Sequence, residues 1–364
     1  MLLSGRGPDC GRGTNTAMAT MNLYPADALR LGLTLGDAAG IGPEVLVAAL
    51  RRTRLLERAH CQLFLVSSWL SWFENFAAEH QLPTAREPAV GALELVVAGE
   101  AAGPPAAWGQ PTVAGRRDAF TALQAMVAAA KSGRLDGVVT GPVPKGIFDH
   151  LTPRPPGQTE YLARELAAPR FAMMLAGPLL RVVPVTTHIP LQKVPEVLTT
   201  QAIVNASLAA AETLQHWFGL AAPRLAICGL NPHAGEDGRC GDEEARVIAP
   251  AVAQLQAAGI AATGPVVADT VFYQAMAGRY DAVICMYHDQ ALGPLKTVHF
   301  HDAVNLTCGL PVPRLSPDHG TAYDLAGSGT ASPESTIAAL TLVEQFARQN
   351  RQFQSQLQVA DAVL

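Results

Sequence analysis

The sequence predicts an α/β fold made of two α/β/α domains with largely parallel sheets. Three observations favour it. The chain has 364 residues, 49% of them hydrophobic, which is enough apolar material for two cores. Short apolar runs alternate with longer amphipathic segments, as they do when helices cross over between parallel strands. Three of these runs end in a histidine, so polar groups gather where parallel strands end.

Short apolar runs mark the expected strands, and longer segments with one apolar face mark the expected helices. In chain order, the expected strands are Leu31–Leu35, Gln62–Val66, Gly137–Thr140, Phe171–Leu175, Arg181–Thr186, Arg224–Cys228 and Asp281–Met286. The expected helices are Glu44–Arg54, Asp118–Ser132, Ala202–Phe218, Asp242–Ala258 and Glu334–Asn350. The Pro- and Gly-rich stretch Gly103–Gly115 predicts a surface excursion between elements. This alternation indicates a largely parallel sheet with helices on both faces.

Composition limits the classes of function. A net charge of −5 gives no global basic field, so we expect neither nucleic acid nor a membrane as a partner. No apolar run is long enough to cross a bilayer. The six cysteines form no CxxC pair, which favours reduced thiols and a cytoplasmic protein. Residues 1–29, rich in Gly, Ser, Thr and Pro, predict a disordered leader rather than a signal peptide.

Each of three apolar runs that are expected to form strands has a histidine at or just beyond its C-terminal end. The runs RVVPVTTH, RLAICGLNPH and DAVICMYHD end at or near His188, His233 and His288. Because ligands of open α/β sheets bind beyond the carboxyl ends of the strands, these side chains predict a shared divalent-metal site. The alternative is three unrelated histidines bonded to nearby backbone. Asp289 could orient the ring of His288 or could instead cap a helix.

A second set of residues is cationic and polar. Lys296, Asn305 and Arg314 follow His288, and PPGQTEY places Gln158 and Thr159 in a turn. Lys and Arg together with neutral donors suit a phosphate monoester. Taken singly, each residue is as well explained by a surface position or a helix cap, but in a chain with only 16% charged residues the set predicts a phosphate site.

Two glycine-rich loops could approach a ligand closely. One is LTLGDAAGIGPEVL, where a strand leads through glycines into a helix. The other is DHGTAYDLAGSGTASPEST, in which His319 and Asp324 supply polar groups. Neither contains GxGxxG, so a nicotinamide cofactor would not use the usual dinucleotide fingerprint. Each loop could also be a structural turn.

Taken together, the motifs resemble one enzyme family. GDAAGIGPE, TGPVPK, PGQTEY, TTHIP, GLNPHAGE, ADTVF, MYHDQ, NLTCGLPVPR and DHGTAYDLAG occur in the order seen in the 4-hydroxythreonine-4-phosphate dehydrogenase family, from about Leu31 to Phe346. Two of these loops also resemble those of isopropylmalate and isocitrate dehydrogenases. The resemblance implies an isopropylmalate-dehydrogenase-like fold with the active site in the interdomain cleft. The first, cofactor-side domain would be 30–150 plus 305–364, and the second, metal-side domain 151–304.

The resemblance also implies roles for individual residues. A divalent metal (Zn, Mg or Co) would be held by three histidines at the interface of a homodimer, and NAD or NADP would accept hydride. The implied metal ligands are His188, His233 and His288. Residues implied in substrate binding are Gln158, Thr159, Lys296, Asn305 and Arg314, and Asp269 and Lys296 are candidates for acid–base catalysis. Residues implied in holding the adenosine of the cofactor are His319, Gly320 and Asp324.

One departure from the family affects the substrate. The family commonly has histidine where this chain has Gln158, and glutamine keeps a donor and an acceptor but carries no proton. The implied reaction is oxidation of 4-phosphooxy-L-threonine, followed by decarboxylation, in pyridoxal 5′-phosphate biosynthesis. The alternatives are a dehydrogenase of erythronate or threonate 4-phosphate, a three-histidine metallohydrolase, and a binding protein without catalysis. A hydrolase leaves the two isopropylmalate-like loops unexplained.

Overall fold

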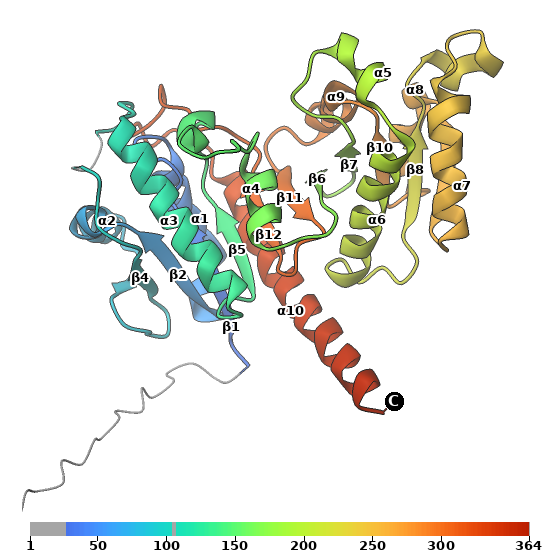
Figure 1. Cartoon of the computed structure of the whole chain (residues 1–364). Coiled ribbons are helices and arrows are strands. Elements are labelled where there is room, and N and C mark those ends of the chain that lie inside the picture. Colours follow the sequence, from blue (N-terminus) through green and yellow to red (C-terminus); the bar gives the residue numbers. More distant parts are fainter. Residues whose placement is uncertain (1–26, 104–106, 364) are drawn as a thin grey trace, which may run out of the picture.

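The computed structural model describes residues 27–103 and 107–363, with side chains as far as residue 358. The leader predicted for residues 1–29 therefore lies almost wholly outside the described residues, as does the centre of the predicted surface excursion. The described chain is a mixed α/β structure in which helices flank a large sheet (Figure 1). None of the described helices is both long and apolar enough to cross a membrane.

The described strands join into one sheet of 12 strands in the order β3-β4-β2-β1-β5-β12-β11-β6-β7-β10-β8-β9. Their bounds are β1 Leu29–Thr34, β2 Ala59–Leu65, β3 Thr84–Ala85, β4 Leu93–Val97, β5 Gly137–Thr140, β6 Ala172–Ala176, β7 Arg181–Pro184, β8 Arg224–Cys228, β9 Ala261–Val266, β10 Ala282–Cys285, β11 Val304–Cys308 and β12 Arg314–Pro317. Each of the seven expected strands overlaps an observed one.

Two parallel blocks meet at the middle of this sheet. β3, β4, β2, β1, β5 and β12 are parallel to one another, and so are β7, β10, β8 and β9. Between the blocks, β11 is antiparallel to both β12 and β6, and β6 is antiparallel to β7. The blocks therefore run in opposite directions, and the two strands β11 and β6 join them. The predicted α/β fold with a largely parallel sheet is confirmed; the domain boundaries stay a prediction.

The helices have the bounds α1 Gly42–Thr53, α2 Ser67–Glu79, α3 Val113–Lys131, α4 Gln158–Glu165, α5 Val194–Val197, α6 Thr200–His216, α7 Ala249–Ala257, α8 Ala268–Met276, α9 His288–Val298 and α10 Glu334–Val363. In the first block α3 packs on β1 and β2, while α1 packs against α10, which also contacts β5 and β12. In the second block α6 packs against α7 and contacts β6 and β10, and α9 packs on β7 and β10.

The two glycine-rich loops of the sequence pack against each other. The Ile41 amide donates to the Thr321 carbonyl at 2.9 Å. The Tyr323 hydroxyl donates to Oδ2 of the fully buried Asp37 at 2.7 Å, and burial raises the pKa of Tyr323 to about 12. A Cβ on Gly40 would lie 2.5 Å from the Thr321 carbonyl oxygen, so only glycine permits this approach. The loops therefore form one packed unit at the start of α1.

Candidate active site

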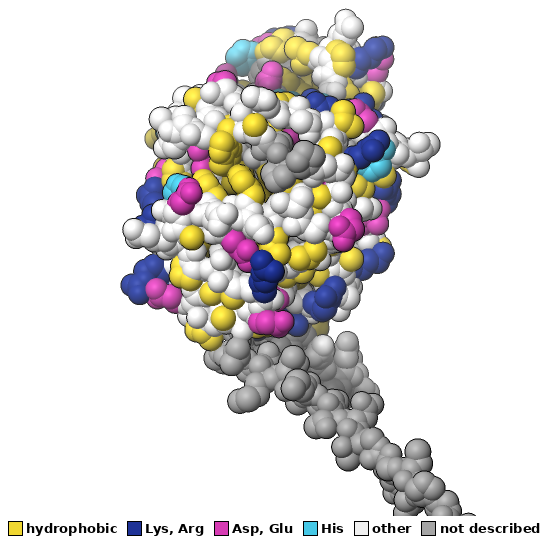
Figure 2. Space-filling model, turned by 90° about the vertical axis from the view of Figure 1, so that its left-hand side faces the viewer, with side chains coloured by type: hydrophobic (Ala, Val, Ile, Leu, Met, Phe, Trp, Pro, Cys, Tyr) yellow, Lys and Arg dark blue, Asp and Glu magenta, His cyan; other side chains and the backbone are white. Residues whose placement is uncertain are grey.

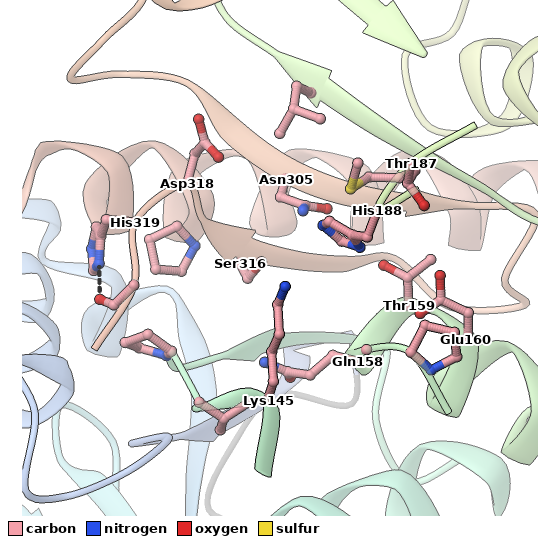
Figure 3. Close-up of a pocket in the computed structure, with 18 of the residues that line it drawn as sticks. Lys145, Gln158, Thr159, Glu160, Thr187, His188, Asn305, Ser316, Asp318 and His319 are labelled. Carbon is pink, nitrogen blue, oxygen red and sulfur yellow. Dashed lines mark hydrogen bonds between the residues drawn. The ribbon is translucent and has the colours of Figure 1, made fainter. Parts of the chain in front are cut away.

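A cavity of about 410 Å³ lies over the central strands, and its floor is one face of β12, β11 and β6 (Figure 3). Arg314 and Ser316 alternate along β12, and Leu175 lies on β6. Asn305 of β11 pairs directly with Ser316 on one side and with Leu175 on the other. Since side chains of directly paired residues share a sheet face, the floor is set by strand register.

The walls of the cavity come from both blocks. The first block contributes Pro142–Lys145, which follow β5, and Gly157–Glu160 at the start of α4. The second block contributes Thr187 and His188 after β7, and His288 and Lys296 from α9. Asp318, His319 and Gly320, which follow β12, also line the cavity.

Arg314 is a buried cation without a counter-ion. Its side chain is 2% exposed, and none of the ion pairs between described residues includes it. Its Nη2 donates to Thr140 Oγ1 at 2.6 Å and its Nη1 to Thr307 Oγ1 at 3.3 Å, while Nε finds no partner among the described residues. Burial lowers the pKa of Arg314 to about 10, so the charged guanidinium is disfavoured where it lies. Such a group is suited to receive an anion.

Two neutral side chains beside Arg314 present unsatisfied oxygen atoms. Gln158 donates from Nε2 to the Gly141 carbonyl at 3.4 Å, but its Oε1 is buried without a partner in the described structure. Asn305 Oδ1 is buried and unpartnered in the same sense. Thr159, next to Gln158, is buried at the start of α4. Because an unmade hydrogen bond at a buried polar atom is costly, these acceptors indicate a ligand that supplies donors.

Lys296 is already paired. Its Nζ lies 3.2 Å from Oδ2 of Asp318, whose side chain is only 14% exposed. Burial raises the pKa of the Asp318 carboxyl, and the charge of Lys296 opposes that rise. The neighbouring His319 uses Nδ1 to bond the Gly320 carbonyl at 3.0 Å, and its Nε2 is buried without a partner among the described residues. Burial lowers the pKa of His319, so the ring is neutral near pH 7.

His188 and His288 are brought together at the other side of the cavity, with ring centroids 5.7 Å apart. Burial, then the nearby charges of Lys145 and His288, lower the pKa of His188, which favours the neutral ring with one unprotonated nitrogen. His288 Nδ1 lies 2.7 Å from Asp289 Oδ1, so Nδ1 donates and Nε2 stays available as a ligand. Asp289 makes no cap bond to α9, whose N-cap residue is Tyr287. Of the two roles predicted for Asp289, this contact therefore supports orientation of the His288 ring rather than capping of the helix.

The structure does not bring His233 to this pair. His233 follows β8, which neighbours β10 in the sheet, so the three histidines do leave the same sheet edge. The chain then enters a run of positive φ angles from His233 to Asp237, which leaves His233 exposed and outside the cavity. Asp269, at the start of α8, is likewise exposed and outside. Within the described part of one chain, no three His, Cys, Asp or Glu side chains form a metal-binding group.

Of the three residues predicted to hold the cofactor, two line the cavity and one does not. His319 and Gly320 line the cavity, whereas Asp324 is exposed beyond it. On the side of the molecule that carries α2 and β4, Lys and Arg are interspersed with Asp and Glu, so this face shows no patch of a single charge (Figure 2).

Sequence reasoning missed several lining residues. Lys145, Glu160, Thr187, Ser316 and Asp318 all line the cavity, yet none was a candidate. Lys145 and Asp318 each lie inside a motif used for the family resemblance, TGPVPK and DHGTAYDLAG. Their position inside those motifs was the sequence signal that could have identified them as site residues.

The chain is similar to known proteins over most of its length. A family model described as pyridoxal phosphate biosynthetic protein PdxA matches residues 48–343. A 4-hydroxythreonine-4-phosphate dehydrogenase of Bradyrhizobium diazoefficiens is 44% identical over 336 residues, covering 87% of this chain and 96% of that relative. A crystal structure of that enzyme from Klebsiella pneumoniae has a TM-score of 0.77 at 33% identity, covering 88% of this chain and 100% of the other. A terephthalate 1,2-cis-dihydrodiol dehydrogenase from Burkholderia xenovorans has a TM-score of 0.61 at 26% identity, covering 87% and 97%.

Proposed function

The chain belongs to the PdxA family of pyridoxal phosphate biosynthetic proteins, and from that premise we propose that it is a NAD(P)- and metal-dependent dehydrogenase of the cytoplasm. Its substrate would be 4-phosphooxy-L-threonine, oxidised to 2-amino-3-oxo-4-phosphooxybutanoate. This β-keto acid then loses carbon dioxide to give 3-amino-2-oxopropyl phosphate. The observation that carries the proposal is a single cavity that holds both a buried arginine without an ion-pair partner and a pair of histidines whose ring centroids lie 5.7 Å apart.

The phosphate would lie against Arg314. Its unpartnered Nε points to an acceptor, and charge-assisted bonds to phosphate oxygens would offset the burial of the guanidinium. Thr159 at the start of α4 would donate from its hydroxyl to the same group, whereas the free Oε1 of Gln158 would accept a hydrogen bond from a hydroxyl or amino group of the substrate. Asn305, on the floor between the two walls, would accept a hydrogen bond from a hydroxyl or amino group of the substrate.

A divalent metal would be held by His188 and His288, whose rings lie close together and whose imidazole nitrogens are common ligands of divalent metals. When bound, it would stabilise the negative charge that develops on the alcohol oxygen. We propose that His233 of a second subunit completes the ligand set and that Asp269 of that subunit also approaches the substrate. In support, His188 and His288 also line an adjacent cavity of about 400 Å³ bordered by the 65% exposed Leu191. Such an exposed apolar rim is typical of an interface.

The nicotinamide would enter along His319 and Gly320, and it supplies the hydride acceptor when bound. When bound, the nicotinamide would accept the hydride of the alcohol carbon, and the hydroxyl proton would pass to a base of the protein. The Lys296–Asp318 pair is placed to take that proton, since both groups line the cavity 3.2 Å apart.

A second substrate remains in consideration because of Gln158. Erythronate or threonate 4-phosphate has a hydroxyl where 4-phosphooxythreonine has an amino group, and the printed name of the Burkholderia xenovorans relative is that of a dehydrogenase acting on a different alcohol. The decisive experiment measures the absorbance of NADH and NADPH formed by metal-loaded protein with each of the three phosphates. Formation of reduced cofactor with 4-phosphooxythreonine at the highest kcat/KM supports the proposal; none with any of them would refute the dehydrogenase.

A further inference from the structure

The cations predicted from the sequence do not supply enough free positive charge in the cavity to balance a bound phosphate. A phosphate monoester carries a charge between about −1.5 and −2 near neutral pH. Of the cations expected from the sequence, Arg314 is free to meet it, but Lys296 is already neutralised by the carboxylate of Asp318. A single unpaired guanidinium would leave roughly one negative charge of the phosphate uncompensated in a partly buried site.

Lys145 is a cation that nothing else in the described structure neutralises. It begins the short helix Lys145–Phe148 behind β5, lines the cavity, and takes part in none of the ion pairs between described residues. Figure 3 shows its side chain pointing into the cavity. The positive charge of Lys145 acts across the cavity, because it contributes to the lowered pKa of His188.

Lys145 and Arg314 belong to the same side of the site. Arg314 is bonded to Thr140, the last residue of β5, and Lys145 lies on the loop that continues from that strand. Glu160, at the start of α4, is a wall carboxylate without an ion-pair partner among the described residues, and its Oε2 lies 3.2 Å from where a Cβ on Gly157 would lie. A helix N-terminus favours negative charge there, but the charge of Glu160 also acts on Arg314, where it opposes the lowering of the pKa by burial. Arg314 alone therefore leaves still less positive charge for a phosphate, and a second cation is needed.

We propose that Lys145 is a second phosphate-binding residue, which pairs with Arg314 to balance the phosphate dianion of the substrate. The proposal rests on the proposed function and deepens it. Arg314 supplies fixed, directional donors from the floor, and Lys145 supplies a mobile charge from the wall. Lys296 is thereby left to act with Asp318 at the reacting end of the substrate.

The test is the affinity for phosphate compounds, measured by calorimetry without cofactor, so that it does not depend on turnover. Lys145→Met should raise the Kd for 4-phosphooxythreonine and for inorganic phosphate about tenfold, allowing for the exposure of the lysine. Lys145→Arg should stay within about threefold of wild type, because it keeps the charge. The matched control is Lys131→Met, at the exposed end of α3, which should leave both affinities unchanged.

Two further measurements, steady-state kinetics and binding of a substrate analogue, test the same proposal. In Lys145→Met, KM should rise while kcat stays within about threefold, as for lost binding that is equal in the ground and transition states. For 4-hydroxythreonine, which lacks the phosphate, the variant and wild type should bind equally. Unchanged phosphate affinity in Lys145→Met, or an equal loss for 4-hydroxythreonine, overturns the inference. If phosphate affinity falls as expected but no alcohol is oxidised, the inference stands and the proposed dehydrogenase does not.

Discussion

The two ends of the cavity differ in how complete they are within one chain. At the Arg314 end, the cation is 2% exposed and fixed by Thr140 and Thr307 on neighbouring strands. At the histidine end, His288 is 34% exposed, His188 is exposed, and the third predicted ligand is elsewhere. The first end is built on rigid strands and is preformed. The second consists of residues just beyond strand ends, which a metal and a second subunit would have to organise.

This difference predicts that substitutions at the two ends behave differently. A change at the Arg314 end should affect only the site of its own chain and should leave other subunits untouched. A change at the histidine end should affect a site that two chains share. Subunit mixing separates the two behaviours, and it gives the largest effect expected here.

His233→Ala and His288→Ala should each abolish turnover, because each removes one ligand from every site. Co-expressed with two different tags, the two variants should recover about a quarter of wild-type activity, because random pairing gives half heterodimers with one intact site each. Metal content, measured by elemental analysis, should follow the same pattern. His301→Ala, exposed and outside both cavities, is the control.

Failure of the mixed subunits to recover either activity or metal would place all three histidines in one chain after a movement of the His233 loop. Full activity in His233→Ala alone would remove this residue from the site. Either result would erase the contrast between the two ends, since both would then be complete in a single chain.

Arg314→Met should reduce kcat/KM by about 100- to 1,000-fold, since it removes a buried charge that would meet the phosphate. The melting temperature should stay the same or rise, because burial already disfavours the guanidinium, as its lowered pKa of about 10 reports. Arg134→Met, on the exposed turn after α3, should change neither quantity. A lost phosphate affinity accompanied by unfolding would show that Arg314 serves the fold rather than the ligand. Thermal unfolding and kinetics on the same samples distinguish the two.

The contrast between the two ends also explains what the sequence could predict. Strands such as β8 and β5 were predicted with their observed bounds, because each is a short apolar run with clear limits. β11 and β12 were not predicted, although they carry Asn305 and Arg314. β11 alternates apolar and polar residues over five positions, which is the pattern of a half-buried strand, so it could have been predicted from the sequence. β12 begins with a charged residue and ends at a proline, so its sequence does not mark it as a strand.

Residue types at the site could be predicted, but their pairing could not. The sequence pointed to Lys296 and Arg314 as one cationic set. The structure separates them, since Asp318 neutralises the first while the second has no counter-ion among the described residues. In the same way, the common strand-end position of His233 was visible, but the left-handed run that directs it away from His188 was not. Both outcomes depend on contacts between distant segments, which no local pattern encodes.

Asp318→Asn tests whether the carboxylate of Asp318, in the middle of the cavity, accepts the proton of the substrate hydroxyl. The change keeps the size of the side chain but removes the carboxylate that pairs with Lys296. The rate should fall about 100- to 10,000-fold, the usual contribution of a positioned acid–base group. In wild type, kcat should decline as pH falls through the raised pKa of Asp318, because only the ionised carboxylate accepts a proton. The variant should lack that limb of the profile, which a purely structural role would preserve. Asp149→Asn, an exposed residue paired with Arg154, is the control.

Gln158→His should have the smallest effect, and its direction depends on pH. Gln158 lies beside Arg314 with an unpartnered Oε1, and histidine restores the residue common in the family. Above the ordinary imidazole pKa of about 6.5, the ring is neutral and KM should stay within about threefold of wild type. Below that pKa the ring gains a positive charge beside the phosphate, so KM should fall as pH falls, a dependence absent from wild type at this position. Thr159→Val and Lys296→Met should cost more at every pH. Equal losses in all three variants would mean that the Gln158 amide recognises a specific group of the substrate, and the Arg314 end would then select the alcohol as well as bind its phosphate.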